Sequence, residues 1–227
     1  NWDKMGKADS VFEVIGPIMI GPSSSHTAAA ARIGKIIREL VGEPIKEAHI
    51  LLHGSFASTG IGHGTDKALV AGLMGFDPDD ERIRDAQSIA SEQGMKYELE
   101  KGDLGDEYHP NTTRIKAVGV NGTTFTVTAS SLGGGNIAVN EINGLKLELS
   151  GEYNTLVTIH SDERGVVAKV TSIIANYDVN ISSMNVSRTT RGGQAIMAVE
   201  MDQTLPEEAI KELDSVVRIA RFIPPIY

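Results

Sequence analysis

Apolar residues at helical spacing follow a polar stretch near the start of the chain, GPSSSHT at residues 21–27. The apolar positions that recur every three or four residues after it are Ile33, Ile36, Ile37 and Leu40. This spacing predicts a helix that begins among the hydroxyl side chains, which are typical of helix caps. The free main-chain N–H groups and the dipole at such a helix start favour an anion.

The segments up to about residue 150 alternate between strand-like and helix-like patterns. Residues 45–53, IKEAHILLH, predict a strand that places His49, Leu51 and His53 on one face and ends in a glycine-rich polar loop, HGSFASTGIGHGTD. Helices are expected from about Thr65 to Met74 and over DPDDERIRDAQSIASEQG, which has an acidic first turn and a glycine stop. TRIKAVGV, an Asn-Gly turn and TTFTVTASS predict a hairpin, and the runs NIAVNEING and KLELSG follow SLGGG. Helices on mixed strands predict an α/β or α+β domain.

From about Gly151 the pattern describes a second, smaller unit. Its expected elements, in order, are the strand YNTLVTIH, the helix GVVAKVTSIIANY, the strands VNISSMNVSRTT and QAIMAVEM, the helix LPEEAIKELD and the strand VVRIARFIP. This βαββαβ order is that of the ferredoxin-like fold. We therefore expect two domains, residues 1–150 and 151–227.

Composition narrows the possible functions. The net charge of −9 gives no basic surface for nucleic acid or for an anionic membrane. No apolar run is long enough to span a bilayer and no signal-peptide pattern opens the chain, so a cytoplasmic location is expected. The chain contains no cysteine, which excludes disulfides, thiol catalysis, thiolate zinc sites and any iron–sulfur cluster held by its own thiolates.

The hydroxyl-rich stretch GPSSSHT does not fit a serine nucleophile. Adjacent side chains at a helix start point about 100° apart, so Ser25 and His26 form no dyad, and the chain has no GxSxG elbow. Two interpretations remain. The stretch is either a helix cap with spare serines or a cradle for a small anion.

Four histidines lie in polar segments marked by glycine or proline, namely His26, His53, His63 and His109. Their spacing fits no zinc template such as HExxH, and a role as general base or as partner of a carboxylate suits a group that titrates near neutral pH. His49 and His160 lie within strand-like runs, where structural roles are expected. The SLGGG and HPNT segments either turn the chain tightly or let a ligand approach the backbone, and SLGGG has neither dinucleotide nor P-loop spacing.

The motifs GPSSSHT with ARIG, HGSFASTGIGHGTD, HPNT and SLGGG, in this order, resemble the β chain of iron–sulfur-dependent L-serine dehydratase. Residues 11–151 resemble the β domain of that family, and residues 151–227 resemble an ACT domain, a βαββαβ module that binds amino acids. Ala29 stands where a glycine is expected, which is a small change.

The resemblance implies a subunit that takes part in converting L-serine to pyruvate and ammonia but is inactive alone. The family's 4Fe-4S cluster is held by a separate α chain, so the implied partners are that chain and L-serine, with no metal bound by this chain. The implied candidates for the base are His26, His53 and His63, and Asp66 is a candidate to orient a histidine. The implied substrate-binding residues are Ser23, Ser24, Ser25, Thr27, Ser55, Thr59, Asp66, His109 and Asn111.

The ACT resemblance implies an effector site and a homodimer formed side by side through residues 151–227. The expected effector-binding residues are Arg164, Gly165, Val166 and Asn180. Two alternatives remain open. One is a purely regulatory subunit that senses an amino acid, as related pairs of these domains do in some phosphoglycerate dehydrogenases. The other is a stand-alone metal hydrolase that uses the four loop histidines.

Overall fold

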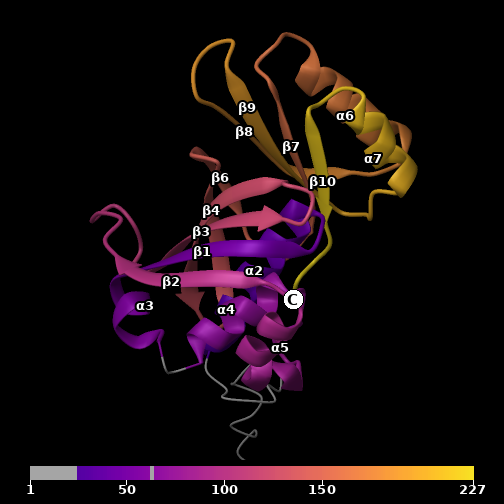
Figure 1. Ribbon diagram of the computed structural model, residues 1–227. Coiled ribbons are helices and arrows are strands. Elements are labelled where there is room, and N and C mark those ends of the chain that lie inside the picture. Colours follow the sequence, from indigo (N-terminus) through magenta and orange to yellow (C-terminus); the bar gives the residue numbers. More distant parts are fainter. Residues whose placement is uncertain (1–24, 62–63) are drawn as a thin grey trace, which may run out of the picture.

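A computed structural model describes residues 25–61 and 64–227 and arranges them around two β-sheets (Figure 1). The larger sheet has the strand order β2-β1-β3-β4-β5-β6, with β1 and β2 parallel and the other neighbours antiparallel. Its strands are β1 (Ile45–His53), β2 (Lys96–Gly102), β3 (Asn111–Gly119), β4 (Thr124–Gly133), β5 (Asn136–Ile142) and β6 (Leu145–Leu149). No helix in the described ranges is long and apolar enough to cross a membrane.

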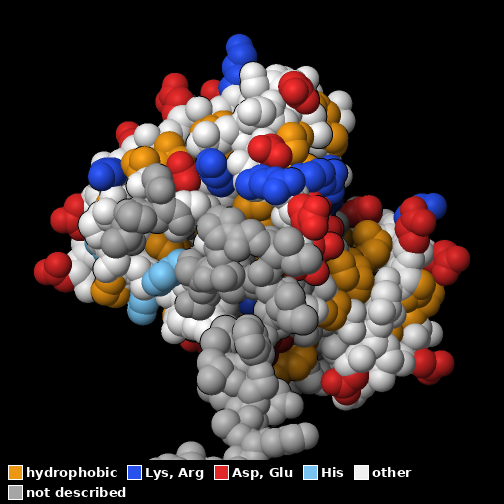
Figure 2. Space-filling view, turned by 90° about the horizontal axis from the view of Figure 1, so that it is seen from below, with side chains coloured by type: hydrophobic (Ala, Val, Ile, Leu, Met, Phe, Trp, Pro, Cys, Tyr) orange, Lys and Arg blue, Asp and Glu red, His pale blue; other side chains and the backbone are white. Residues whose placement is uncertain are grey.

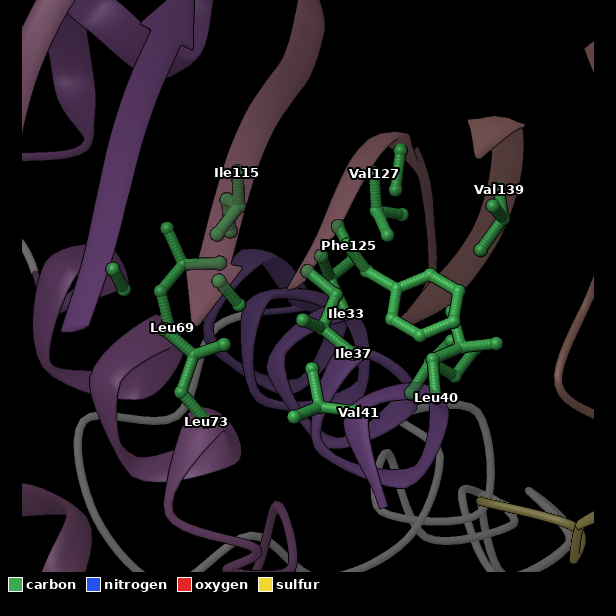
Figure 3. Packing of buried hydrophobic residues seen from close by; sticks show 14 of the residues in the cluster. Ile33, Ile37, Leu40, Val41, Leu69, Leu73, Ile115, Phe125, Val127 and Val139 are labelled. Atoms are coloured by element: carbon green, nitrogen blue, oxygen red, sulfur yellow. The ribbon is translucent and has the colours of Figure 1, made fainter. Parts of the chain in front are cut away.

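Helices α2 (Ser25–Val41) and α4 (Thr65–Leu73) pack together beneath one face of this sheet. The two helices approach closely at Gly34, where an added Cβ would lie 2.5 Å from the carbonyl oxygen of Leu69. Figure 3 shows the apolar side of α2, with Ile33 and Ile37, directed at Phe125 and Val127 of β4. The remaining helical segments of this half are α3 (Gly54–Thr59), the 3₁₀ helix η1 (Glu81–Asp85) and α5 (Ala86–Glu92).

The second sheet has the order β10-β7-β9-β8. Its elements are β7 (Asn154–Ser161), α6 (Val166–Asn176), β8 (Ile181–Arg188), β9 (Gln194–Met201), α7 (Glu207–Asp214) and β10 (Ile219–Ile223). Helices α6 and α7 cover one face, around Val170, Ile174 and Leu213. Val157, Ile159 and Ile196 on the other face join the core of the larger sheet, so the two halves share one continuous hydrophobic core.

Most of the predicted elements are confirmed. The strand over residues 45–53, the hairpin through Asn121 and Gly122, and the βαββαβ order of the second half agree with the sequence interpretation. The apolar stripe predicted after Thr27 is fully buried on α2. The mixed α/β class is therefore correct, whereas the domain boundary near residue 150 stays a prediction.

Two predictions are wrong in detail, and one strand was not predicted. The segment after His53 is not only a loop, because Gly54–Thr59 forms α3. The helix expected from residue 77 begins at Glu81 as a 3₁₀ turn capped by Asp80, whose carboxylate accepts the N–H of Arg82, and becomes α-helical only at Ala86. Strand β2 was not expected, because its sequence KYELEKG is mostly charged and polar and it forms an exposed edge beside β1.

Candidate functional site

The polar stretch GPSSSHT leads into the start of α2, as its pattern predicts. Ser23 and Ser24 lie outside the described residues, and the described part begins with Ser25 as the first helical residue. Thr27 is buried and His26 is half-buried in the first turn. The first turn contains no acidic side chain, so the positive end of the helix dipole favours an anion there.

Helix α3 lies beside this first turn. The imidazole ring of His26 meets the ring of Phe56 edge to face, with 6.1 Å between centroids and 69° between planes. The Nδ1 atom of His26 is buried and has no hydrogen-bond partner. One ring nitrogen of His26 is therefore held in the interior with its proton-accepting or proton-donating capacity unused.

His53 closes β1 just before α3, and its hydrogen bonding defines its tautomer. The main-chain N–H of Leu104 donates to His53 Nδ1 over 2.9 Å. A donor facing Nδ1 requires a lone pair there, so the neutral ring carries its proton on Nε2. The carboxylate of Asp103 lies beside the ring, with Oδ1 at 3.6 Å from Nδ1. In this arrangement His53 is a hydrogen-bond donor through Nε2.

The HPNT segment is joined to the start of α3. Gly54, at φ +57°, forms a bridge to Asn111, and an added Cβ on Gly54 would collide with the carbonyl oxygen of Pro110. The N–H of Ser55 donates to that same oxygen over 2.7 Å. Asn111 Oδ1 is buried without a hydrogen-bond partner. The structure thus brings Ser55 and Asn111, two predicted substrate-binding residues, to the same place.

The SLGGG segment lies against the first half of α2. Gly133–Gly135 all have positive φ and turn β4 into β5. The NH1 group of Arg32 donates to the carbonyl oxygen of Gly135 over 2.6 Å, and an added Cβ on Gly135 would lie 3.7 Å from that of Ala28. The hydroxyl of Ser131, near the end of strand β4, is buried without a hydrogen-bond partner. Sequence analysis did not single out Arg32 or the side chain of Ser131, because only burial makes them conspicuous.

Other predicted site residues have different surroundings or are not described. Asp66 accepts hydrogen bonds from the N–H of Lys67 over 2.9 Å and from Gln87 over 3.5 Å. Burial, and then the charge of Asp66, raise the pKa of Tyr97. His63 lies outside the described residues, and so do the side chains of Ser25 and Thr59. The orientation of a histidine by Asp66 therefore stays a prediction.

His109 faces a different space from Asn111. Its Nδ1 accepts the N–H of Asn111 over 3.0 Å, and the residue lines a cavity of about 890 Å³. This cavity is bordered by residues of β4, β5, β6 and β8, including Ser130, Glu141 and Lys146. The hydrogen bond from Tyr108 to Glu141, 2.8 Å long, raises the pKa of that tyrosine. His109 therefore faces this cavity, whereas Asn111 lies on the face of the sheet that packs against α2.

Neither the sequence nor the described residues offer a set of ligands for an iron–sulfur cluster or a histidine-rich metal centre. The sequence has no cysteine, and across residues 25–61 and 64–227 no three His, Asp or Glu side chains come together as metal ligands. Figure 2, seen from below, shows histidine side chains at the surface.

The predicted effector residues lie at two loops of the second sheet. Gly165, at φ +88°, precedes α6, whose first residue is Val166, and Arg164 beside it is exposed. Asn180 donates to the carboxylate of Asp202 over 2.7 Å, just before β8. The described contacts do not join Asn180 to Arg164.

Comparison with known proteins gives a consistent result over most of the chain. The family model described as serine dehydratase beta chain matches residues 10–142, and the ACT domain model matches residues 154–218. The chain is 42% identical to the L-serine dehydratase beta chain of Peptoniphilus asaccharolyticus, over 87% of this chain and 89% of that one. It is 41% identical to the probable L-serine dehydratase beta chain of Bacillus subtilis, over 94% and 96%. It is also 30% identical to the D-3-phosphoglycerate dehydrogenase of Bacillus subtilis, over 82% of this chain but 35% of that protein.

Proposed function

The chain belongs to the serine dehydratase beta chain family, and from this premise we propose that it is the beta subunit of an L-serine dehydratase. In this role it helps convert L-serine to pyruvate and ammonia by covering the active site of an alpha chain. The observation that carries the proposal is the meeting of three separate motifs at one end of α2. His26 contacts Phe56 of α3, and α3 in turn is bonded to Pro110 of the HPNT segment.

The start of α2 is suited to the carboxylate of L-serine. Main-chain N–H groups at the first turn and the positive end of the helix dipole attract an anion, and the hydroxyls of GPSSSHT supply further donors. Asn111, whose Oδ1 has no partner, supplies an acceptor of the kind that a substrate ammonium group requires. These are the groups needed to bind and orient an amino acid.

The histidines divide into a donor and candidate bases. His53 holds its proton on Nε2, because Leu104 occupies Nδ1, so it donates to the substrate rather than removing the Cα proton. The base is therefore sought among His26, whose Nδ1 has no partner, and His63.

Expelling the hydroxyl of serine requires a cofactor, and this chain has no cysteine with which to hold an iron–sulfur cluster itself. Loss of hydroxide from serine needs a Lewis acid or an electron sink, and a 4Fe-4S cluster on the alpha chain would supply the Lewis acid. We therefore propose an alpha–beta complex in the cytoplasm, in which the present chain binds, orients and takes the proton.

Purification of the chain alone and with its alpha chain tests this division of labour. The isolated chain should be colourless and should not turn over L-serine, and addition of the cluster-bearing alpha chain should restore pyruvate formation. Turnover of L-serine by the metal-free chain alone would refute the proposal.

The match to phosphoglycerate dehydrogenase favours one second candidate, a regulatory subunit without catalytic groups. In that case single alanine variants of His26, His53 and His63 would all retain near-normal kcat in the reconstituted complex. Loss of activity in any of them, with folding preserved, decides for the catalytic role.

The second half of the chain has a separate proposed role. An ACT domain at residues 154–218 supports a homodimer that binds an amino acid, which we propose to be L-serine, between Arg164, Gly165 and Val166 of one chain and Asn180 of its mate. The start of α6 has no acidic residue in its first turn, as a carboxylate ligand requires.

A further inference from the structure

Two fully packed side chains near the start of α2 have polar atoms without a partner. Arg32 is 6% exposed and Ser131 is 0% exposed. Arg32 Nε and Ser131 Oγ are both buried and make no hydrogen bond. Buried polar groups are nearly always paired, so two such donors close together require a reason.

Arg32 is a buried cation without a balancing carboxylate. Its described contacts are the carbonyl oxygen of Gly135, at 2.6 Å, and the ring of Tyr227, whose centroid lies 4.0 Å from the guanidinium carbon. None of the ion pairs among the described residues involves it, and burial lowers its pKa. A guanidinium in this position costs free energy until an anion reaches it.

The strand register places Ser131 on the face of the sheet that packs against α2, the helix that carries Arg32. Ser131 pairs with Ile137, whose side chain belongs to the core beneath the sheet, so the serine hydroxyl is on the face that packs against α2. The N–H of Ile137 donates to the hydroxyl of Tyr227 over 3.0 Å, and Arg32 lies over that same tyrosine ring. Arg32 and Ser131 are therefore both neighbours of the Ile137–Tyr227 pair.

The same group faces the start of α2. Side chains of a helix lean toward its N-terminus, and Arg32 contacts Gly135 at the level of Ala28, one turn nearer to His26. Thr112 pairs with Ser130, so Asn111 and Ser131 follow as the next residues on the two strands, on the helix side. Asn111 and Ser131 therefore lie on neighbouring strands, on the face that packs against the helix of Arg32.

We infer that Arg32 and Ser131 are substrate-binding residues that hold the carboxylate of L-serine through Arg32 Nε–H and the Ser131 hydroxyl. The inference deepens the proposed function and rests on it. The carboxylate balances the guanidinium charge, while Gly135 and Tyr227 fix the guanidinium plane. Asn111 then accepts from the ammonium group of the same amino acid.

The test uses the reconstituted alpha–beta complex with Ser131→Ala and, as matched control, Ser130→Ala. Ser130 is the adjacent serine on the opposite face, and its hydroxyl bonds Thr112 and Asn140 at 2.7 and 2.8 Å. Ser131→Ala should raise KM for L-serine about 10–100-fold, the range for a hydrogen bond to a charged group. It should leave the thermal unfolding temperature unchanged, because it breaks no hydrogen bond within the protein. Ser130→Ala should lower that temperature and leave KM unchanged.

Two inhibitors identify the substrate group that is bound. L-alanine keeps the carboxylate and ammonium groups of L-serine, and L-alaninamide lacks the anionic carboxylate. In Ser131→Ala and in Arg32→Lys, the inhibition constant of L-alanine should rise by the same factor as KM, and that of L-alaninamide should not change. An unchanged KM in Ser131→Ala, or an equal rise for both inhibitors, overturns the inference. A wild-type complex that does not turn over L-serine overturns the proposed function itself.

Discussion

Arg221 of β10 donates a hydrogen bond from Nε to the main-chain carbonyl oxygen of Leu40, 2.9 Å away, at the C-terminal end of α2. The guanidinium lies against Gly42, which turns the chain at φ +73° after the helix. A cation at this position satisfies a free carbonyl and complements the negative end of the helix dipole. The second sheet therefore holds the far end of the helix whose first turn forms the candidate site.

Arg221→Ala should therefore destabilise the whole chain rather than the second half alone. Loss of a hydrogen bond from a charged group predicts a decrease of about 1.5–3 kcal/mol in the free energy of unfolding. Urea unfolding followed by circular dichroism measures this decrease. Arg218→Ala, at an exposed position on the same segment, is the control and should have little effect. A separate early transition for the second half would contradict the shared core.

His160 predicts how stability depends on pH. This histidine is buried on β7, and burial lowers its pKa, with a smaller opposing effect from Asp162. The unfolded chain then binds a proton near pH 6.5 that the folded chain does not, so stability falls as pH decreases below about 6.5. Urea unfolding at pH 7.5 and pH 5.5 should show a larger loss for wild type than for His160→Gln. Equal losses would mean that other groups control the acid limb.

The sequence predicts those elements whose pattern is decided by burial on one face. Residues 45–53 alternate because only one face of β1 lies in the core of the larger sheet. Ile33, Ile36 and Ile37 recur because α2 packs on the same face of this sheet, mainly against β4. Strand β2 has no such pattern, because it is an exposed edge paired only with β1. Helix α3 consists of small and hydroxyl residues with weak helix propensity and is held by Phe56 in the core and by the bond from Ser55 to Pro110.

The candidate site likewise contains residues that a sequence pattern reveals and residues that only the folded structure reveals. Motif order identifies His26, His53 and Asn111, because polar residues in loops stand out from an apolar pattern. Arg32 and Ser131 are ordinary residues in a helix and a strand, and only their burial without partners sets them apart. The tautomer of His53 depends on Leu104, fifty-one positions away, which no local pattern indicates.

The hydrogen bond from Leu104 to His53 predicts the result of two substitutions. His53→Gln retains an N–H donor at about the reach of Nε2, so kcat/KM in the complex should stay within about tenfold of wild type. His53→Phe removes the donor and should reduce kcat/KM by about 10²-fold, at the low end for a group that assists proton transfer. The acid limb of the pH profile of kcat should be unchanged in both variants. Disappearance of that limb in His53→Phe would identify His53 as the base instead.

For His26 we expect the opposite of the result for His53, namely a loss of the acid limb of the pH profile on substitution. Its Nδ1 makes no hydrogen bond, so His26→Ala removes mainly the ring contact with Phe56 and should lower the unfolding temperature only slightly. If His26 is the base, kcat falls about 10²–10⁴-fold and the acid limb of the pH profile is lost. Stopped assays of pyruvate formation across pH 5.5–9 measure both effects. A normal kcat in this variant leaves His63 as the remaining candidate base, and a normal kcat in His63→Ala as well favours the regulatory subunit.

Strand β8 predicts where two chains meet. It is the outer strand of its sheet, and Met184 and Val186 on it are 42% and 49% exposed. An edge strand with exposed apolar side chains is suited to pairing with a second copy, which would bury both the side chains and the free main-chain groups. Val186→Lys should therefore shift the chain from dimer to monomer in equilibrium sedimentation. Val120→Lys makes the same change at a 50% exposed valine of a distant turn and should remain dimeric.

L-serine should tighten the wild-type dimer, because a ligand bound only by the dimer shifts the equilibrium toward it. A wild-type chain that stays monomeric at high concentration, with or without L-serine, would contradict pairing through β8.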